Sequence, residues 1–272
     1  MGRRMSNVDD GFQVHTSADM TALSVTQVIL HCLASLFRLY TYFCYRTSSY
    51  EWTHRAEESL RASWDAALPT IYTFWHDEFL ILSLNAFCAR VQFPVCVAND
   101  SWGGRVVARI WALHGAPVVV IARGESRELR ITRIREALVR KRRLVLAADY
   151  GKPWFKARNT AQSLAMSSEG SVVAMHLRCD RSAAVGYGKW RVQIPTPFNR
   201  YTLHLSRPMR AHAATPEAIA AALWSLRETA RGSAPCREDP FAIECAKNGS
   251  TMPGDWKTCP DLRTDHGQVP ST

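Results

Sequence analysis

Four short apolar runs, each followed by a compact polar motif, constrain the fold of this chain more than any other feature. The first run covers residues 69–75 and leads into His76, and segments with helical spacing separate the runs. Strands that alternate with such helices predict βαβ units, and therefore an α/β fold with a mainly parallel sheet flanked by helices. The later runs, at 93–98, 117–122 and 143–148, lead into Asn99-Asp100, Arg123-Gly124-Glu125-Ser126 and Asp149-Tyr150-Gly151-Lys152.

The spacing of apolar residues, together with the positions of proline and glycine, predicts where each helix and strand begins and ends. Ile131, Ile134 and Leu138 recur at spacings of three and four, which predicts an amphipathic helix. The two strands expected last in the chain lie close together, which favours antiparallel additions to the sheet. We expect helices at 22–45, 52–67, 77–90, 104–114, 126–140, 156–169 and 216–230, and strands at 70–75, 93–98, 117–122, 143–148, 172–177, 189–194 and 201–205.

The composition predicts one large domain with extensions. We expect a polar N-terminus at 1–20, an apolar membrane-associating helix at 21–50, the main domain at 51–231 and a disordered tail at 232–272. Residues 22–45 are long and apolar enough to span a bilayer, but Arg38 within them favours peripheral or monotopic attachment. Whether this helix spans the membrane is left open by the sequence.

Net charge indicates the kind of partner, and cysteine content indicates the redox environment. The net charge of +10 indicates an anionic partner, such as lipid headgroups, a nucleotide-bearing cofactor or nucleic acid. The segment from residue 123 to 143 contains nine Arg or Lys and three Glu. This basic cluster is either an anion-binding surface or a solvated helix face. The eight cysteines include no C-x-x-C pair, which favours a reduced, cytosolic setting without a zinc site or disulfide framework.

His76 is the first candidate catalytic residue. An imidazole at the end of a buried strand suits a general base, because its ordinary pKa of roughly 6.5 allows proton exchange near neutrality. The imidazolium that forms needs a carboxylate, and Asp100 or Asp149 from other strand ends are better candidates than the adjacent Asp77 and Glu78, which point away on a helix. The alternative is a structural histidine that caps the following helix.

The motif from Arg123 to Ser126 suits an anion. A guanidinium beside the exposed amides of a helix N-terminus can bind a phosphate or the oxyanion of a tetrahedral intermediate. The alternative is a turn in which Ser126 is a plain N-cap. In the fourth motif, Gly151 permits a tight turn and Lys152 supplies a point charge, so this segment is a candidate substrate loop or a surface turn.

With these motifs in order, residues 69–209 resemble the lysophospholipid-acyltransferase-like superfamily. The pattern is most similar to a bacterial branch, formerly of unknown function, that carries F-W-H after the first strand. The matching segments are Phe74-Trp75-His76, Asp100 with Gly103-Gly104, Arg123-Gly124-Glu125-Ser126, Asp149-Tyr150-Gly151-Lys152-Pro153 and Ile194-Pro195-Thr196-Pro197-Phe198. The wider superfamily has H-x-x-x-x-D, whereas position 81 here is Ile81.

The resemblance implies a glycerolipid acyltransferase-like fold and transfer of a fatty acyl group from acyl-CoA or an acyl carrier protein to a hydroxyl of a lipid such as a lysophospholipid. It implies catalytic roles for His76, Asp100 and Asp149, phosphate binding at the motif from Arg123 to Ser126, and acceptor contacts at Gly151 and Lys152. No metal or bound cofactor is implied, and the thioester is a co-substrate.

Two further function classes compete with this enzyme. One is a non-catalytic protein that binds anionic lipid on the same fold, since the usual aspartate is missing at position 81. The other is a nucleic-acid-binding module, which the charge alone prompts and which lacks aromatic residues on the basic helix. A hydrolase is disfavoured because the chain has no G-x-S-x-G elbow. We therefore expect an anionic membrane surface, at the cytoplasmic face, and no nucleic acid as partner.

Overall fold

The computed structural model describes residues 25–65, 68–85, 94–149, 155–181, 183–186 and 192–231. The chain divides into two units, Met1–Arg227 and Glu228–Thr272, and the account below concerns the first. The polar N-terminus at 1–20 and the disordered tail from residue 232, both expected from the sequence, lie outside the described residues.

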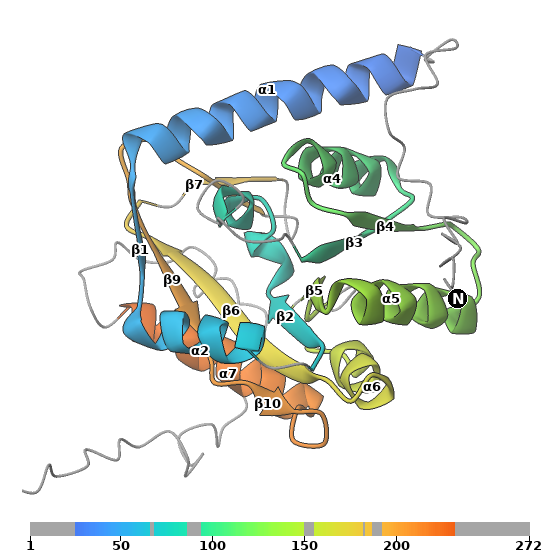
Figure 1. Ribbon diagram of the computed structural model, residues 1–272. Helices are drawn as coiled ribbons and strands as arrows, with labels where there is room; N and C mark the ends of the chain where they lie inside the picture. The colour runs from blue at the N-terminus through green and yellow to red at the C-terminus, as the bar shows by residue number, and fades with distance from the viewer. Residues whose placement is uncertain are drawn as a thin grey trace, which may run out of the picture. The chain divides into compact units, whose positions relative to one another are not determined.

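Among the described residues, eight strands form one sheet in the order β1-β9-β6-β2-β5-β3-β4, with β10 paired to β6 (Figure 1). Most pairings are parallel, and β9 and β10 add to β6 in the antiparallel sense. The predicted α/β class with a mainly parallel sheet is confirmed. The strands are β1 Ser49–Trp52, β2 Thr70–Phe74, β3 Val95–Asn99, β4 Val118–Ile121, β5 Arg143–Ala147, β6 Ser171–Cys179, β7 Ala183–Val185, β8 Val192–Ile194, β9 Arg200–Leu205 and β10 Met209–Arg210, where β7 and β8 pair separately.

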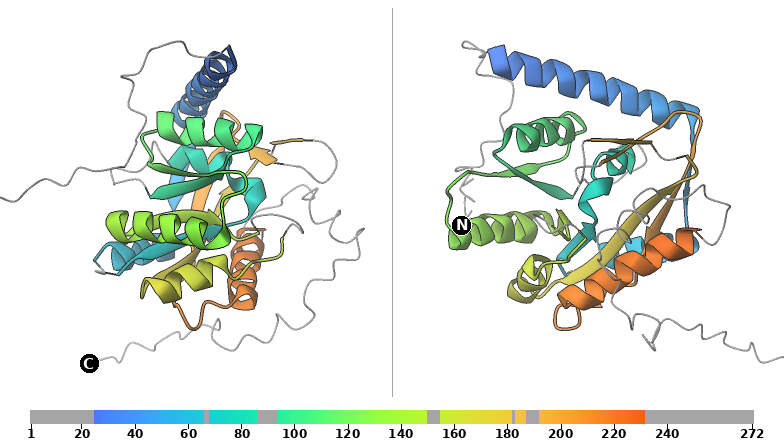
Figure 2. Two further views of the ribbon diagram at one scale, coloured as in Figure 1. Left: turned by 90° about the vertical axis from the view of Figure 1, so that its right-hand side faces the viewer. Right: turned by 180° about the vertical axis from the view of Figure 1, so that it is seen from behind.

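Helices cover both faces of the sheet (Figures 1 and 2). They join the strands in the alternation that the sequence predicts, and two short 3-10 turns follow β2. The helices are α1 Val25–Thr47, α2 His54–Asp65, α4 Trp102–Leu113, α5 Arg127–Lys141, α6 Thr160–Ser167 and α7 Pro216–Arg231, and the turns are η1 His76–Glu78 and η2 Ile81–Leu84.

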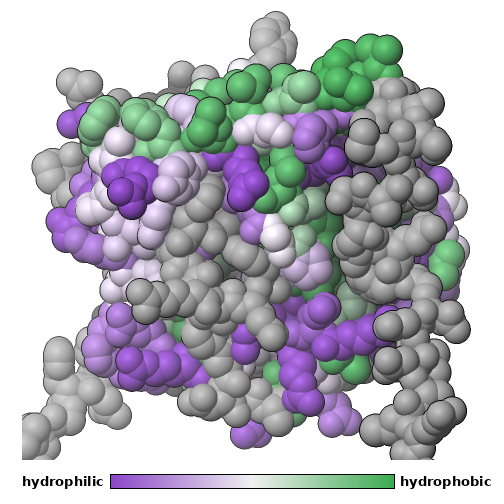
Figure 3. Space-filling model, turned by 45° about the horizontal axis from the view of Figure 1, so that its top comes forward, coloured by the Kyte–Doolittle hydropathy of each residue, from purple (hydrophilic) through white to green (hydrophobic). Residues whose placement is uncertain are grey.

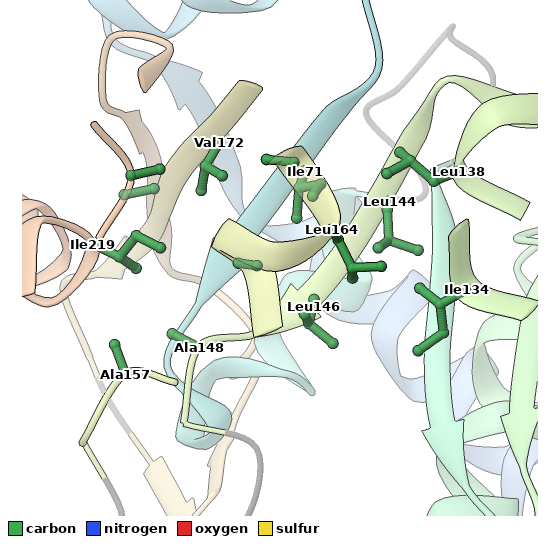
Figure 4. Packing of buried hydrophobic residues seen from close by; sticks show 14 of the residues in the cluster. Ile71, Ile134, Leu138, Leu144, Leu146, Ala148, Ala157, Leu164, Val172 and Ile219 are labelled. Carbon is green, nitrogen blue, oxygen red and sulfur yellow. The ribbon is translucent and has the colours of Figure 1, made fainter. Parts of the chain in front are cut away.

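The central strands are buried on both faces, and alternate residues supply two hydrophobic cores. Ile71 and Leu144 belong to the core that α5, α6 and α7 cover. Figure 4 shows this core, which also contains Ile134 and Leu138 of α5. Tyr72 and Val145, one position further along each strand, belong to the opposite core with η2 and α4. The two-sided burial explains why these strands read as continuous apolar runs.

Three sequence-based assignments were wrong. The strand expected at 189–194 as an antiparallel addition to the sheet is β8 in the described residues, and it pairs with β7 in a separate two-stranded sheet. The helix expected at 52–67 begins at His54, and the residues before it form β1, which pairs parallel with β9. Thr53 caps this helix, because its hydroxyl accepts a hydrogen bond from the Ala56 amide at 3.2 Å. The helix expected from residue 77 is replaced, as far as the described residues extend, by η1 and η2, because the side chains after β2 are held by distant partners.

Gly104 lies where α4 approaches the end of β3. A Cβ atom there would collide with the main-chain and side-chain oxygens of Asn99, whereas a Cβ on Gly103 meets open space. Gly104→Ala should therefore lower the free energy of unfolding by about 1–3 kcal/mol, the cost of overpacking. Gly103→Ala should raise it by up to about 1 kcal/mol through helix propensity. Urea denaturation of the two variants measures the difference, and equal effects would contradict the close approach.

Candidate functional site

The carboxyl ends of β2, β5, β3 and β4 meet at one edge of the sheet and carry the polar motifs. The register pairs Phe74 with Ala147 at the end of β2 and β5, and Asn99 with Ile121 at the end of β3 and β4. The Asp100 amide then donates to the carbonyl of Ile121 at 2.9 Å. Neighbouring strands lie about 4.8 Å apart, so the ends of β2 and β4 are separated by roughly 14 Å along this edge.

His76 lies at this edge, directly after β2 and in the first residue of η1. Its side chain is half-buried and its ring lies 5.3 Å from that of Phe79, centroid to centroid. Burial lowers the pKa of His76 below its ordinary value, and the charge of Asp77 opposes this shift in part. The imidazole is therefore neutral near pH 7, the form in which it can accept a proton.

Asp149 is completely buried next to His76 and holds the main chain on two sides. One carboxylate oxygen accepts a hydrogen bond from the His76 backbone amide at 2.9 Å, and the other accepts one from the Phe155 backbone amide at 2.9 Å. These bonds fix where the peptide of His76 lies. The sequence left open whether Asp100 or Asp149 pairs with the imidazole, and the two hydrogen bonds described above for Asp149 run to backbone amides.

The pKa of Asp149 gives a test of this burial. Loss of solvation raises it to about 6, although the two backbone amides act in the opposite direction. Between about pH 4 and pH 6 the folded protein then binds more protons than the unfolded chain, so stability falls as the pH rises through this window, by about 3 kcal/mol. Carboxyl 13C NMR should show Asp149 titrating near pH 6, and a midpoint below 4 would contradict the buried placement.

Asp77 and Glu78 are the functional candidates that sequence reasoning set aside. They do point apart, and each reaches a different buried partner. Asp77 accepts hydrogen bonds from Arg227 at 2.8 Å and from Gln193 at 3.0 Å. Glu78 lies 2.9 Å from His176 of β6. The available signal was two acidic residues at the end of a fully apolar strand, since charges buried there require partners.

Three consecutive residues after β2 are thus anchored from three directions. His76 is held through its amide by Asp149 after β5, Asp77 by Arg227 of α7, and Glu78 by His176 of β6. Such anchoring limits the freedom of the turn that carries the imidazole, which is the condition for a precisely placed general base.

Asp100 is partly exposed and paired with the nearby Arg105, whose Nε lies 2.6 Å from a carboxylate oxygen. The hydrogen bond from Arg105 lowers the pKa of Asp100, with a smaller contribution from the charge of Arg123. Asp100 therefore stays ionised at neutral pH. It lies beside the Arg123 motif, two strands from His76 in the sheet order.

The motif from Arg123 to Ser126 forms the turn between β4 and α5. Gly124 has φ of +86°, which favours glycine. Glu125 accepts from the Ala122 amide at 3.0 Å and pairs with Arg133 at 3.0 Å, and Ser126 is the N-cap of α5 through the Leu129 amide. Glu125 and Ser126 thus shape the turn, while Arg123 is exposed at the positive end of the helix.

Two predicted site residues, Gly151 and Lys152, lie outside the described residues, which stop at Asp149 and resume at Phe155. Within the described part of the chain, no three His, Cys, Asp or Glu side chains are grouped to hold a metal ion.

Fold and edge geometry define an α/β protein with a mostly parallel sheet whose polar residues gather at the carboxyl ends of the strands. No protein-family model matches the chain, and no curated protein matches it. Its function is therefore argued from the site.

Proposed function

We propose that this protein transfers a fatty acyl group from a thioester donor to a hydroxyl of a lipid acceptor such as a lysophospholipid, on a glycerolipid acyltransferase-like fold. The observation that carries the proposal is His76, a half-buried imidazole with a lowered pKa, at the strand edge that also carries Arg123. The donor is acyl-CoA or acyl carrier protein, and no bound cofactor takes part.

The reaction balances with groups of this chain. A ring nitrogen of His76 takes the proton of the acceptor hydroxyl while its oxygen attacks the thioester carbonyl. The tetrahedral intermediate then collapses, the carbon–sulfur bond breaks, and the imidazolium returns the proton to the leaving thiolate. An ester and a free thiol result.

The imidazolium formed in the first step needs a negative charge nearby. The superfamily motif supplies an aspartate five residues after the histidine, but Ile81 in that place is fully buried in the apolar core. Asp77 is the acidic group whose charge favours protonated His76 in this protein. We therefore assign to Asp77 the electrostatic role, and to Asp149 the positioning of the histidine backbone.

Arg123 suits the phosphate of the acceptor. The guanidinium is exposed, and it stands before the N-terminus of α5, where the helix dipole favours an anion. The resemblance also implies acceptor contacts at Gly151 and Lys152, which lie outside the described residues.

Arg123→Gln tests this assignment. The variant should raise KM for a lysophospholipid acceptor roughly tenfold, because a charge-assisted phosphate contact is worth about 1.5–3 kcal/mol. Its kcat should change much less. Initial rates of acceptor-dependent thiol release measure both constants, with Arg135→Gln, an exposed arginine two turns into α5, as the control. An unchanged KM would remove Arg123 from the acceptor site.

The alternative is a lipid-binding protein without chemistry, and the buried Ile81 at the usual aspartate position favours it. The two functions differ in one readout. If purified protein binds lysophospholipid yet releases no thiol from acyl-CoA or acyl carrier protein, the alternative replaces the enzyme.

A further inference from the structure

Helix α1 has an inner face that docks on the domain. Leu30, Ala34, Thr41 and Cys44 are its buried residues and recur along one side. Thr41 lies 3.2 Å from the Nε2 atom of the buried His114, which follows α4, and His31 accepts from Arg109 of α4 at 2.8 Å. These contacts hold α1 alongside α4 over much of its length (Figures 1 and 2).

The outer face of α1 is apolar and exposed. Its large side chains recur at spacings of three, four and seven, which keep them on a single helix face. Figure 3 shows these apolar side chains gathered along the helix. At 1.5 Å per residue, the stripe from Val25 to Phe43 is about 27 Å long. The exposed residues of this stripe are Val25, Val28, Ile29, Leu36, Leu39 and Phe43.

Phe198 extends this apolar stripe from a distant part of the chain. It is 66% exposed, has φ of +55°, and its ring meets that of Phe43 edge-on at 6.2 Å. Its loop is fastened to α1, because the Tyr40 hydroxyl donates to the carbonyl of Pro195 at 2.7 Å. Phe198 is thus held beside α1 while most of its surface faces solvent, and contiguous exposed apolar patches mark interaction surfaces.

We infer that the outer stripe of α1 and Phe198 together form a lipid-facing surface, on which the protein lies with α1 in the plane of an anionic bilayer. The charges fit this partner: α1 contains no acidic residue and exposes Arg38 and Arg46. Cationic side chains beside an apolar helix face are the pattern of interfacial helices.

The contacts of the inner face favour a helix α1 that lies on the membrane over one that crosses it. By length and composition α1 is the one described helix that could span a bilayer. Spanning would pull α1 off α4, break the contacts of Thr41 with His114 and of His31 with Arg109, and place the His31 imidazole in hydrocarbon. A second copy of the chain is a poorer occupant, because a symmetric contact would bring the arginines of two identical faces together.

Vesicle binding tests this surface without any reliance on acyl transfer. Leu36→Gln with Leu39→Gln, and separately Phe198→Ser, should each reduce partitioning onto vesicles of phosphatidylcholine with phosphatidylglycerol, the double variant roughly tenfold or more. The matched control is Leu129→Gln, an exposed leucine of α5. His76→Ala should bind as wild type, so a failed enzyme and a failed membrane surface are distinguishable.

Equal binding by the Leu36/Leu39 variant and wild type would overturn the inference. So would wild-type protein that ignores vesicles but forms a dimer that these substitutions dissociate, since the surface would then serve a second copy. These positions are exposed, so the substitutions remove no core packing, and circular dichroism checks that each variant is folded.

Spin labels measure the depth of α1. Labels at Val28→Cys, Leu36→Cys and Phe43→Cys, each in an otherwise cysteine-free chain that binds vesicles like wild type, should report one common shallow depth. A helix in the interface lies about 5–10 Å into the boundary. A profile with shallow ends and a maximum near 15 Å at position 36 would show a spanning helix and contradict the in-plane orientation.

Discussion

His76→Ala is expected to lower kcat/KM for acyl transfer by about 10²- to 10⁴-fold, the usual contribution of a general base. The loss follows because no other neutral imidazole stands at the end of β2 within the described residues. Thiol release from acyl-CoA or acyl carrier protein with a lysophospholipid acceptor measures it. Because the His76 backbone amide is what Asp149 binds, the variant retains this contact and should remain folded.

His54→Ala is the matched control, since this histidine of α2 is exposed at the surface. It should retain full activity. If His76→Ala released thiol as fast as wild type in the presence of acceptor, the imidazole would have no part in the reaction and the proposed mechanism would fail.

Arg227→Met should destabilise the protein by about 3–5 kcal/mol, because it leaves Asp77 buried without its charged partner. Both side chains are almost completely buried, and the guanidinium also lies over the rings of Phe155 and Trp224. Urea denaturation measures the loss. Methionine keeps much of the aliphatic volume, so the missing charge dominates the effect.

Arg200→Met provides the contrast, because its pair with Glu51 is exposed to solvent and should contribute little to the free energy of unfolding. Adding Asp77→Asn to Arg227→Met should recover part of the stability, since the isolated charge is then removed. Equal losses for Arg227→Met and Arg200→Met, or no recovery in the double variant, would show that the buried pair does not hold η1.

The alternation of strands and helices could be predicted because the central strands are buried on both faces and α5 is amphipathic. Ile134 and Leu138 face the core as their spacing predicts. Strand β1 was missed because its four residues alternate between exposed and half-buried positions at the sheet edge and carry little apolar signal. Its place depends on β9, about 150 residues later, and local periodicity holds no information on such a pairing.

The candidate site was predictable in its position and not in its contacts. Strand ends carrying His76, Asp100, Arg123 and Asp149 meet at one edge because parallel strands share a direction. That Asp149 binds backbone amides, and that Asp77 reaches Arg227, depends on burial and on distances across the fold. A helical wheel shows that neighbouring carboxylates diverge, but it does not show what each one meets.

The central claim is that neutral His76 removes the proton of the acceptor hydroxyl, and its titration tests this most directly. The midpoint of the His76 imidazole, measured by NMR, should lie below its ordinary value because the ring is half-buried. The acidic limb of kcat/KM for acceptor-dependent thiol release should fall at the same pH. A rate that does not change as this imidazole becomes protonated would contradict the account.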